Sequence, residues 1–149
     1  MNRYRSILNE VKKAVIGKDD QLEKILTAIL ARGHILLEDI PGVGKTTMAR
    51  AFAAAMSLQT RRMQFTVDVL PSDVIGFMAI DHDSGEPKLH PGAIFCNIFL
   101  ADEINRTSSR TQAALLEVME ENRITVDGVT YPAKSPFIVI ATQNPAGSA

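Results

Sequence analysis

Apolar residues recur at helical spacing in four stretches of the chain, and each stretch predicts an amphipathic helix. A spacing of three to four residues holds over residues 4–15, 22–30, 46–57 and 107–122. Residues spaced in this way lie on one face of a helix, and that face must be covered by the rest of the protein. We therefore expect helices that each bury one face in a common core.

Shorter apolar runs lie around these helices and predict strands at residues 35–37, 62–66, 98–103 and 136–141. The run at 98–103 is apolar at every position before its last two, as a strand covered by helices on both faces requires. Strands and helices alternate along the chain. The sequence therefore predicts an α/β fold with a parallel sheet between two helical layers, a three-layer arrangement.

Two segments fall outside this alternation. Residues 123–131 alternate between apolar and polar positions around Asp127-Gly128, a dipeptide typical of the tight turn in a β-hairpin. Residues 67–92 are rich in turn-forming residues and polar in their middle. We expect both segments to be exposed and mobile.

Composition and charge narrow the functional classes without selecting one. The chain has 149 residues, enough for one domain, of which 46% are hydrophobic and 22% charged. A net charge of −1 without a basic stripe argues against a nucleic-acid partner. The sequence contains no signal-peptide pattern and no apolar run of membrane-spanning length, and its single cysteine, Cys96, permits no internal disulfide. These features predict a cytoplasmic protein without a membrane span, in which Cys96 is a small core residue.

The most informative segment, residues 39–46, lies between a predicted strand and a predicted helix. Gly42 and Gly44 allow backbone N–H groups to approach a phosphate without an intervening Cβ. The following helix directs the partial positive charge of its N-terminus at the same anion. Lys45 can reach the β- and γ-phosphates of a nucleotide, and the hydroxyl of Thr46 can ligate Mg²⁺. The segment therefore predicts a phosphate-binding loop.

The predicted loop departs from the usual pattern at one position, because Asp39 stands where that pattern has a glycine. A carboxylate aimed at a triphosphate would be repelled, so we expect the Asp39 side chain to point away. The residues expected to contact the nucleotide in this loop are Pro41, Gly42, Val43, Gly44, Lys45, Thr46 and Thr47.

Two adjacent carboxylates end the strand predicted at residues 98–103. Asp102 would hold Mg²⁺ through water, and Glu103 would orient and polarise the water that attacks the phosphate. Neighbouring residues on a strand point to opposite faces, so both can serve one site only if the strand ends there and the chain turns. Together with the phosphate-binding loop, the pair predicts hydrolysis of Mg-ATP. The alternative is that both acids merely favour the N-terminus of the following helix.

With both motifs in view, the chain resembles the AAA+ ATPases, and within them the MoxR family. The resemblance covers about residues 16–147. Its most specific pieces are Leu37-Glu-Asp-Ile-Pro-Gly-Val-Gly-Lys-Thr46, Gln64-Phe-Thr66, Leu70-Pro-Ser-Asp-Val-Ile-Gly76, Pro91-Gly92, Leu100-Ala-Asp-Glu-Ile-Asn-Arg106 and Ala141-Thr-Gln-Asn-Pro145.

The resemblance implies further site residues and two insertions. Asn144 would be sensor 1, which places the attacking water against the γ-phosphate, and Ile16 and Gly17 would lie against the adenine. Residues 67–92 would be an insertion in the second core helix, and residues 123–133 a hairpin before sensor 1.

The resemblance also implies the strand order 1-4-3-2 and a protein that acts as a hexameric ring, a chaperone-like remodeller of client proteins. On this basis we expect residues 1–149 to be a partial core without the fifth strand, the helical lid or the arginine finger. We expect such a chain alone to hydrolyse ATP very slowly, because an arginine finger is worth about 10³- to 10⁵-fold in turnover.

Several alternatives stay open from the sequence. The chain could be an inactive nucleotide-binding fragment, a nucleic-acid-dependent motor, or a small-molecule kinase with the same loop. Arg106 could face a neighbouring subunit, the site itself, or a surface acid. Gln64 could hold Glu103 in an inactive pose until a client binds. His34 is expected to be structural rather than a base. The sequence does not identify the client.

Overall fold

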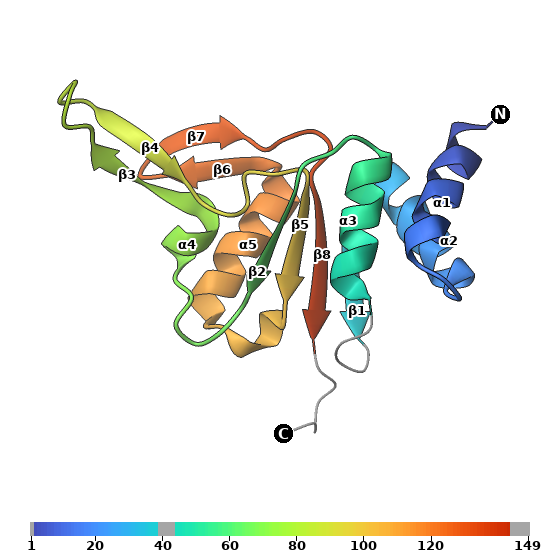
Figure 1. The fold of residues 1–149 in the computed structure, drawn as a ribbon. Coiled ribbons are helices and arrows are strands. Elements are labelled where there is room, and N and C mark those ends of the chain that lie inside the picture. Colours follow the sequence, from blue (N-terminus) through green and yellow to red (C-terminus); the bar gives the residue numbers. More distant parts are fainter. Residues whose placement is uncertain (1, 39–43, 144–149) are drawn as a thin grey trace.

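Four parallel strands form the central sheet of the structure, a computed structural model that describes residues 2–38 and 44–143 (Figure 1). Their spatial order is β1 (Ile35–Glu38), β8 (Ile138–Gln143), β5 (Ile98–Asp102) and β2 (Thr60–Gln64). Along the chain these are the first, fourth, third and second strands of the sheet. The predicted order 1-4-3-2 and the parallel pairing are therefore confirmed.

Helices cover both faces of this sheet, which confirms the three-layer α/β class (Figure 1). One face carries α1 (Arg3–Ala14), α2 (Asp19–Leu30) and α3 (Lys45–Ala55). The other face carries α5 (Ser109–Glu121) and the short α4 (Pro71–Ile75). Successive strand residues point to opposite faces, so β5 and β8 supply apolar side chains to both cores and are buried along almost their whole length.

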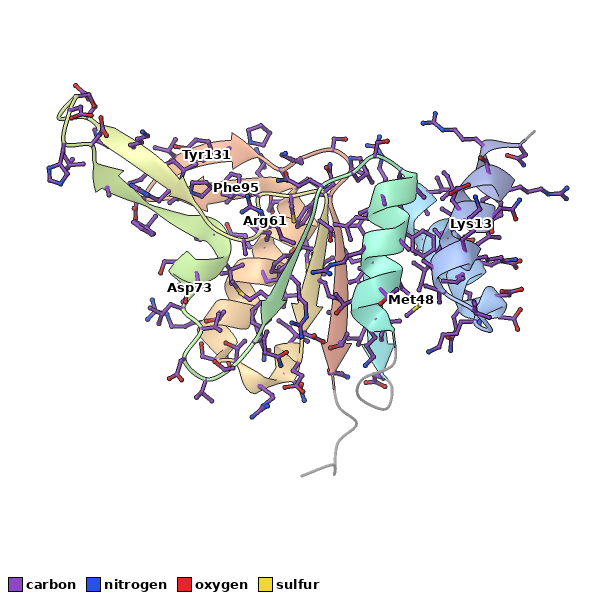
Figure 2. The ribbon with its side chains drawn as sticks, in the orientation of Figure 1. Lys13, Met48, Arg61, Asp73, Phe95 and Tyr131 are labelled. Carbon is purple, nitrogen blue, oxygen red and sulfur yellow. The ribbon has the colours of Figure 1, made fainter. Side chains whose placement is uncertain are left out.

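The two faces of the sheet define two hydrophobic clusters. Ile98, Leu100, Ile138 and Ile140 face α1 to α3, where Met48 lies on the side of α3 toward α1 and α2 (Figure 2). The residues between them in each strand face α5 and the hairpins. Cys96 belongs to this second cluster and is fully buried, as predicted. Burial raises the pKa of its thiol to about 11, so the group stays neutral.

The N-terminus of α2 carries two carboxylates in its first turn. Lys18 is the cap residue, and no side chain caps the helix, whereas Asp19 and Asp20 lie inside the first turn. Carboxylates in the first turn are still favourable, because they face the partial positive charge of the helix N-terminus. The two acids therefore act through the helix dipole rather than as caps.

The hairpin predicted around Asp127-Gly128 is present. The strands β6 (Arg123–Val126) and β7 (Val129–Pro132) pair antiparallel. Asp127 has a φ of 47° and Gly128 a φ of 81°, and two successive left-handed residues are what a two-residue turn of the favoured hand requires. Ile124 and Val126 are buried, so one side of the hairpin belongs to the second cluster.

Residues 67–92 were expected to form an exposed segment, and most of them are exposed, but the base of the segment is folded and packs into the second cluster. The segment contains α4 and an antiparallel pair, β3 (Gly76–Ile80) and β4 (Pro87–Pro91). Val74 is fully buried in the second cluster. The backbone packs closely at the base of the pair, where a Cβ added at Gly92 would lie 2.2 Å from the carbonyl oxygen of Val74. The tip of the pair is exposed, as expected.

The two hairpins contact each other. Asp127 accepts a hydrogen bond from the backbone N–H of Met78 in β3, at 3.2 Å. Phe95 and Tyr131 meet edge to face, with ring centroids 6.2 Å apart, near the base of the β6–β7 hairpin (Figure 2). Residues far apart in sequence thus form one surface at the end of the sheet opposite α1 and α2 (Figure 1).

His34 has a structural role, as expected. Its Nδ1 accepts a hydrogen bond from the backbone N–H of Val139 at 2.9 Å, which leaves Nε2 as the donor to the carbonyl oxygen of Met119 at 3.2 Å. That carbonyl lies in the last turn of α5, where helix carbonyls lack an intrahelical partner. The imidazole therefore joins the end of α5 to β8. Among the described residues, no helix has the length and apolar character needed to cross a membrane.

Candidate active site

The candidate site lies where the parallel strands end. The carboxyl ends of β1, β8, β5 and β2 share one edge of the sheet, and α3 begins at the same edge (Figure 1). Gln64 pairs in register with Asp102 on the next strand. In open α/β sheets the crevice at the carboxyl ends of the strands is the usual place for a ligand. The fold therefore brings Lys45 and Thr46, at the start of α3, to the edge of the sheet where Asp102 and Glu103 lie.

The start of α3 has the geometry of a phosphate-binding helix N-terminus. Gly44 caps it with φ 73° and ψ 7°, a left-handed conformation that favours glycine. Lys45 and Thr46 follow in the first turn and are half-buried, whereas Thr47 is exposed. Their N–H groups have no acceptor within the helix and are free to face an anion.

Several predicted residues lie outside the described ranges. These are Asp39, Pro41, Gly42 and Val43 of the loop, and Asn144 after β8. Their predicted roles stay predictions, and the geometry of the site is carried by the residues on either side of them.

Asp102 is held on both carboxylate oxygens. Its Oδ1 accepts a hydrogen bond from the hydroxyl of Thr142 at 2.6 Å. Its Oδ2 accepts two from the guanidinium of Arg62, from Nη2 at 2.7 Å and from Nε at 3.0 Å. The Asp102 side chain is 17% exposed, so the carboxylate is largely enclosed yet remains accessible from the strand edge.

These contacts keep Asp102 ionised. Burial by itself would raise the pKa of the carboxyl, because a charge is less stable away from water. The hydrogen bonds from Thr142 and Arg62, with the positive charges of Arg62 and Lys45, outweigh burial and lower the pKa below its usual value. An ionised carboxylate beside Lys45 and the start of α3 is an oxygen donor of the kind that Mg²⁺ prefers.

Replacing Arg62 with Met should raise the pKa of Asp102 and lower stability in a pH-dependent way. A carboxyl with a lowered pKa in the folded protein stabilises it above the unfolded pKa, and this contribution is lost as the pH falls through the folded value. The variant should therefore lower the free energy of unfolding at pH 7 by about 1 kcal/mol, because Arg62 is partly exposed and the pair is screened by solvent. The loss should shrink at acid pH, once the pH has fallen through the lowered pKa of Asp102 and the carboxyl has taken up a proton.

Denaturant unfolding at neutral and at acid pH measures this difference. Arg123→Met is the matched control, because it removes an arginine–carboxylate pair, with Glu121, whose side chains are both well exposed. That control should change stability little at either pH. An equal loss for Arg62→Met at both pH values would contradict the assigned role of Arg62.

Glu103 turns back toward the site because β5 ends immediately before it. Its φ of 54° and ψ of 49° are left-handed, and such a conformation costs a non-glycine residue about 1–2 kcal/mol. The backbone N–H of Glu103 donates to the hydroxyl of Thr142 at 3.0 Å, which helps to hold this conformation. The 3₁₀ turn η1 (Ile104–Arg106) follows. The structure thus supplies the chain turn that two adjacent carboxylates need to serve one site.

Within residues 2–38 and 44–143, the Glu103 carboxylate has two hydrogen-bond partners, and the sequence analysis singled out both. Its Oε2 accepts from Gln64 Nε2 at 2.9 Å and from Arg106 Nη1 at 2.9 Å. Arg106 therefore pairs with the candidate base itself, although its own side chain is 61% exposed. Gln64 also accepts from Arg62 through Oε1 at 3.1 Å. One connected set of polar side chains thus joins both carboxylates.

Ile16 and Gly17 lie in the linker between α1 and α2, beside a hollow bordered by Val15 and Lys18. A neighbouring cavity of about 470 Å³ is lined by α2, β1 and Lys45. Lys18 and Gln21 border both hollows, so the linker lies next to the space in front of Lys45. Ile16 is 87% exposed, which leaves its side chain available to a ligand.

Two residues that contact the carboxylates were not identified as site residues from the sequence. Thr142 lies within a segment that the resemblance covers, yet it carried no assigned role, and the pair Arg61-Arg62 looks like a solvated face. For Thr142, the only sequence feature that could have indicated a place in the site was the alternation of side chains along β8. It places Thr142 on the same face of the sheet as Ile138 and Ile140, toward α3. Arg62 had no comparable signal.

The fold and the site together define a phosphate-loop ATPase core of the AAA+ class. Residues 34–149 match the family described as the ATPase family associated with various cellular activities (AAA). The chain is 51% identical to YeaC of Bacillus subtilis (strain 168) over 93% of the chain and 43% of YeaC. It is 43% identical to chaperone MoxR1 of Mycobacterium tuberculosis over 91% of the chain and 36% of MoxR1.

A solved structure agrees with this assignment. The crystal structure of a protein from Cytophaga hutchinsonii, proposed to be an ATPase, superposes with a TM-score of 0.87 at 42% identity, covering 99% of the chain and 45% of that protein. The chain belongs to the MoxR family of AAA+ ATPases. It spans less than half the length of the relatives named here.

Proposed function

We propose that this chain is the nucleotide-binding core of an ATPase that hydrolyses ATP to ADP and phosphate with the help of Mg²⁺. The observation that carries the proposal is the convergence of Asp102 and Glu103 on the strand edge where α3 begins with Lys45. A cation, an ionised carboxylate and a second carboxylate held nearby form the set of groups that phosphoryl transfer to water requires.

Each of these residues has a distinct task in the proposed reaction. The N–H groups at the start of α3 and the Lys45 ammonium hold the negative phosphates and stabilise the charge that develops on the transferring phosphoryl group. Glu103 orients the attacking water and accepts its proton while oxygen bonds to phosphorus and the bond to ADP breaks. Asn144, as sensor 1, would align the same water.

The residues present fit a magnesium ion. Oxygen ligands are available from the Thr46 hydroxyl and, through water, from the Asp102 carboxylate, which its neighbours keep ionised. When bound together with ATP, the ion would neutralise negative charge on the phosphate oxygens. The adenine is proposed to lie in the hollow beside Ile16 and Gly17, an assignment that rests on the family and on the position of that linker.

Phosphate release by the natural full-length protein tests the proposal. The protein is expected to release phosphate from ATP when Mg²⁺ is present, and to stop when a chelator removes it. If the folded protein releases no phosphate with Mg²⁺ under any assembly state, the proposed function is wrong.

We further propose that ATP hydrolysis drives remodelling of a client protein by a ring of subunits. The support is family membership and the description of the relative MoxR1 as a chaperone. The β3–β4 pair and the β6–β7 hairpin, which contact each other through Asp127 and Met78, are proposed to be the insertions that reach the client. Their place at one end of the sheet leaves both tips exposed (Figure 1).

Gln64 is proposed to restrain Glu103 until a client binds. Its amide donates to the Glu103 carboxylate at 2.9 Å, which occupies an oxygen that would otherwise accept a proton from water. Gln64→Ala should therefore raise basal turnover about two- to fivefold, the low end of the range for one hydrogen bond, because Gln64 is exposed and Arg106 still donates to the same oxygen. Client stimulation should become correspondingly smaller.

Steady-state phosphate release with and without client measures both quantities. Gln59→Ala is a suitable control, because Gln59 lies just before β2 and its side chain contacts Lys134 rather than the site. Unchanged basal and stimulated rates in Gln64→Ala would remove Gln64 from the account.

A further inference from the structure

Among the described residues, Thr142 is the one side chain that hydrogen-bonds to both Asp102 and Glu103, to the carboxylate of the first and the backbone of the second. Its hydroxyl donates to Asp102 Oδ1 at 2.6 Å and accepts from the Glu103 N–H at 3.0 Å. It lies in β8, next to β5, and is 2% exposed. Every other hydrogen bond that the side chains of Asp102 and Glu103 accept in the described part of the chain comes from exposed Arg62, Gln64 or Arg106.

The directions of the two hydrogen bonds are fixed by chemistry. A backbone N–H can only donate, so the Thr142 oxygen must accept from Glu103. An ionised carboxylate can only accept, so the Thr142 hydroxyl must give its single hydrogen to Asp102. The hydroxyl therefore cannot rotate to another partner without breaking one of these contacts. It links the orientation of the Asp102 carboxylate to the left-handed backbone of Glu103.

We propose that Thr142 is a positioning residue for hydrolysis, which sets the Asp102 carboxylate for Mg²⁺ and fixes the chain turn that brings Glu103 to the attacking water. This inference rests on the proposed ATPase function. Partners that orient a metal-binding carboxylate commonly matter about ten- to a hundredfold for metal affinity or activity, although they do not touch the metal. Thr142 has this relation to Asp102 and, in addition, to the backbone of the candidate base.

The geometry distinguishes two substitutions at this position. Thr142→Val keeps the shape of the side chain and removes the hydroxyl, so both contacts are lost. Thr142→Ser keeps the hydroxyl and removes one methyl group, so both contacts can re-form. Thr111→Val is the matched control: Thr111 is also buried, and its hydroxyl bonds to the Val69 carbonyl at 2.9 Å, away from the carboxylates.

The test uses the natural full-length protein and two readouts. The first is the gain in ATP affinity on adding Mg²⁺, measured by calorimetric titration with and without a chelator. The second is the turnover number at saturating Mg-ATP. Thr142→Val should reduce the Mg²⁺-dependent gain about tenfold and the turnover number about ten- to a hundredfold. Thr142→Ser and Thr111→Val should stay within about threefold of the wild type in both, a change too small to signal a lost site contact.

Each outcome decides between distinct conclusions. Wild-type values for Thr142→Val in both readouts would overturn the inference and leave the proposed ATPase function intact. Equal losses in Thr111→Val would also overturn it, because the effect would then follow from general destabilisation. A folded Thr142→Ser protein as impaired as Thr142→Val would overturn it too, because the hydroxyl would then not be the group that matters. A wild-type protein that neither binds nor hydrolyses Mg-ATP would overturn the proposed function itself, and the inference with it.

Discussion

Glu103→Gln is expected to lower the rate of ATP hydrolysis by about 10²- to 10⁴-fold, the usual contribution of a general base, while Mg-ATP still binds. The amide has nearly the shape of the carboxylate and can accept the hydrogen bond from Gln64 that the structure shows. It cannot accept a proton from water at neutral pH. The defect should therefore appear in the turnover number rather than in the affinity for ATP.

Single-turnover hydrolysis by the full-length protein measures this loss most cleanly, because it separates the chemical step from product release. Glu117→Gln is the matched control, an exposed glutamate on α5 for which full activity is expected. If the Glu103→Gln protein hydrolysed ATP within about threefold of the wild-type rate, Glu103 would not be the base.

Lys45→Ala is expected to weaken Mg-ATP binding roughly a hundredfold, because a hydrogen bond between charged groups contributes about 1.5–3 kcal/mol. Lys45 is the first residue of α3 and is half-buried, so its ammonium is directed by the fold rather than by solvent. The N–H groups of the helix start remain in the variant. Some residual affinity for phosphate should therefore survive.

Equilibrium binding of ATP in the presence of Mg²⁺ measures the effect of Lys45→Ala. Lys13→Ala provides the control, because Lys13 is an exposed lysine of α1 that pairs only with Glu10 among the described residues. Both variants should unfold at the same temperature as the wild type. Undiminished ATP binding by a folded Lys45→Ala protein would show that the nucleotide binds elsewhere.

Much of the fold follows from local patterns in the sequence. Continuous apolar runs at residues 98–101 and 137–141 predict central strands, because only a strand covered on both faces is apolar at every position. The Asp127-Gly128 hairpin was also predictable, since its turn needs two left-handed residues and this dipeptide supplies them cheaply. The strand order came from the family resemblance, and no local pattern contains it.

The structure of residues 67–92 was not predictable in the same way. The strands β3 and β4 are five residues each, and β4 begins and ends with proline, which is a poor strand signal. Their pairing is completed by packing against Tyr131 and neighbouring residues from later in the chain. Short elements of this kind depend on tertiary contacts more than on their own sequence.

The candidate site also contains residues that local sequence predicts and residues that only tertiary contacts bring to it. The spacing and residue types of two motifs in the sequence predict the roles of Lys45, Thr46, Asp102 and Glu103. The roles of Thr142 and Arg62 are not predicted in this way, because each lies 40 residues from Asp102 in sequence and reaches it only through strand pairing. Contacts of that separation are set by register between neighbouring strands. They become visible only when the sheet is assembled.

Calorimetric titration of ATP into the wild-type protein, once with Mg²⁺ and once with a chelator, tests the central claim most directly. The account predicts one ATP bound per chain and an affinity that falls when Mg²⁺ is removed, because the ion that Asp102 and the start of α3 are proposed to hold together with the phosphates is then missing. A folded protein that binds no ATP in either titration, or that binds ATP equally well without Mg²⁺, would contradict the account.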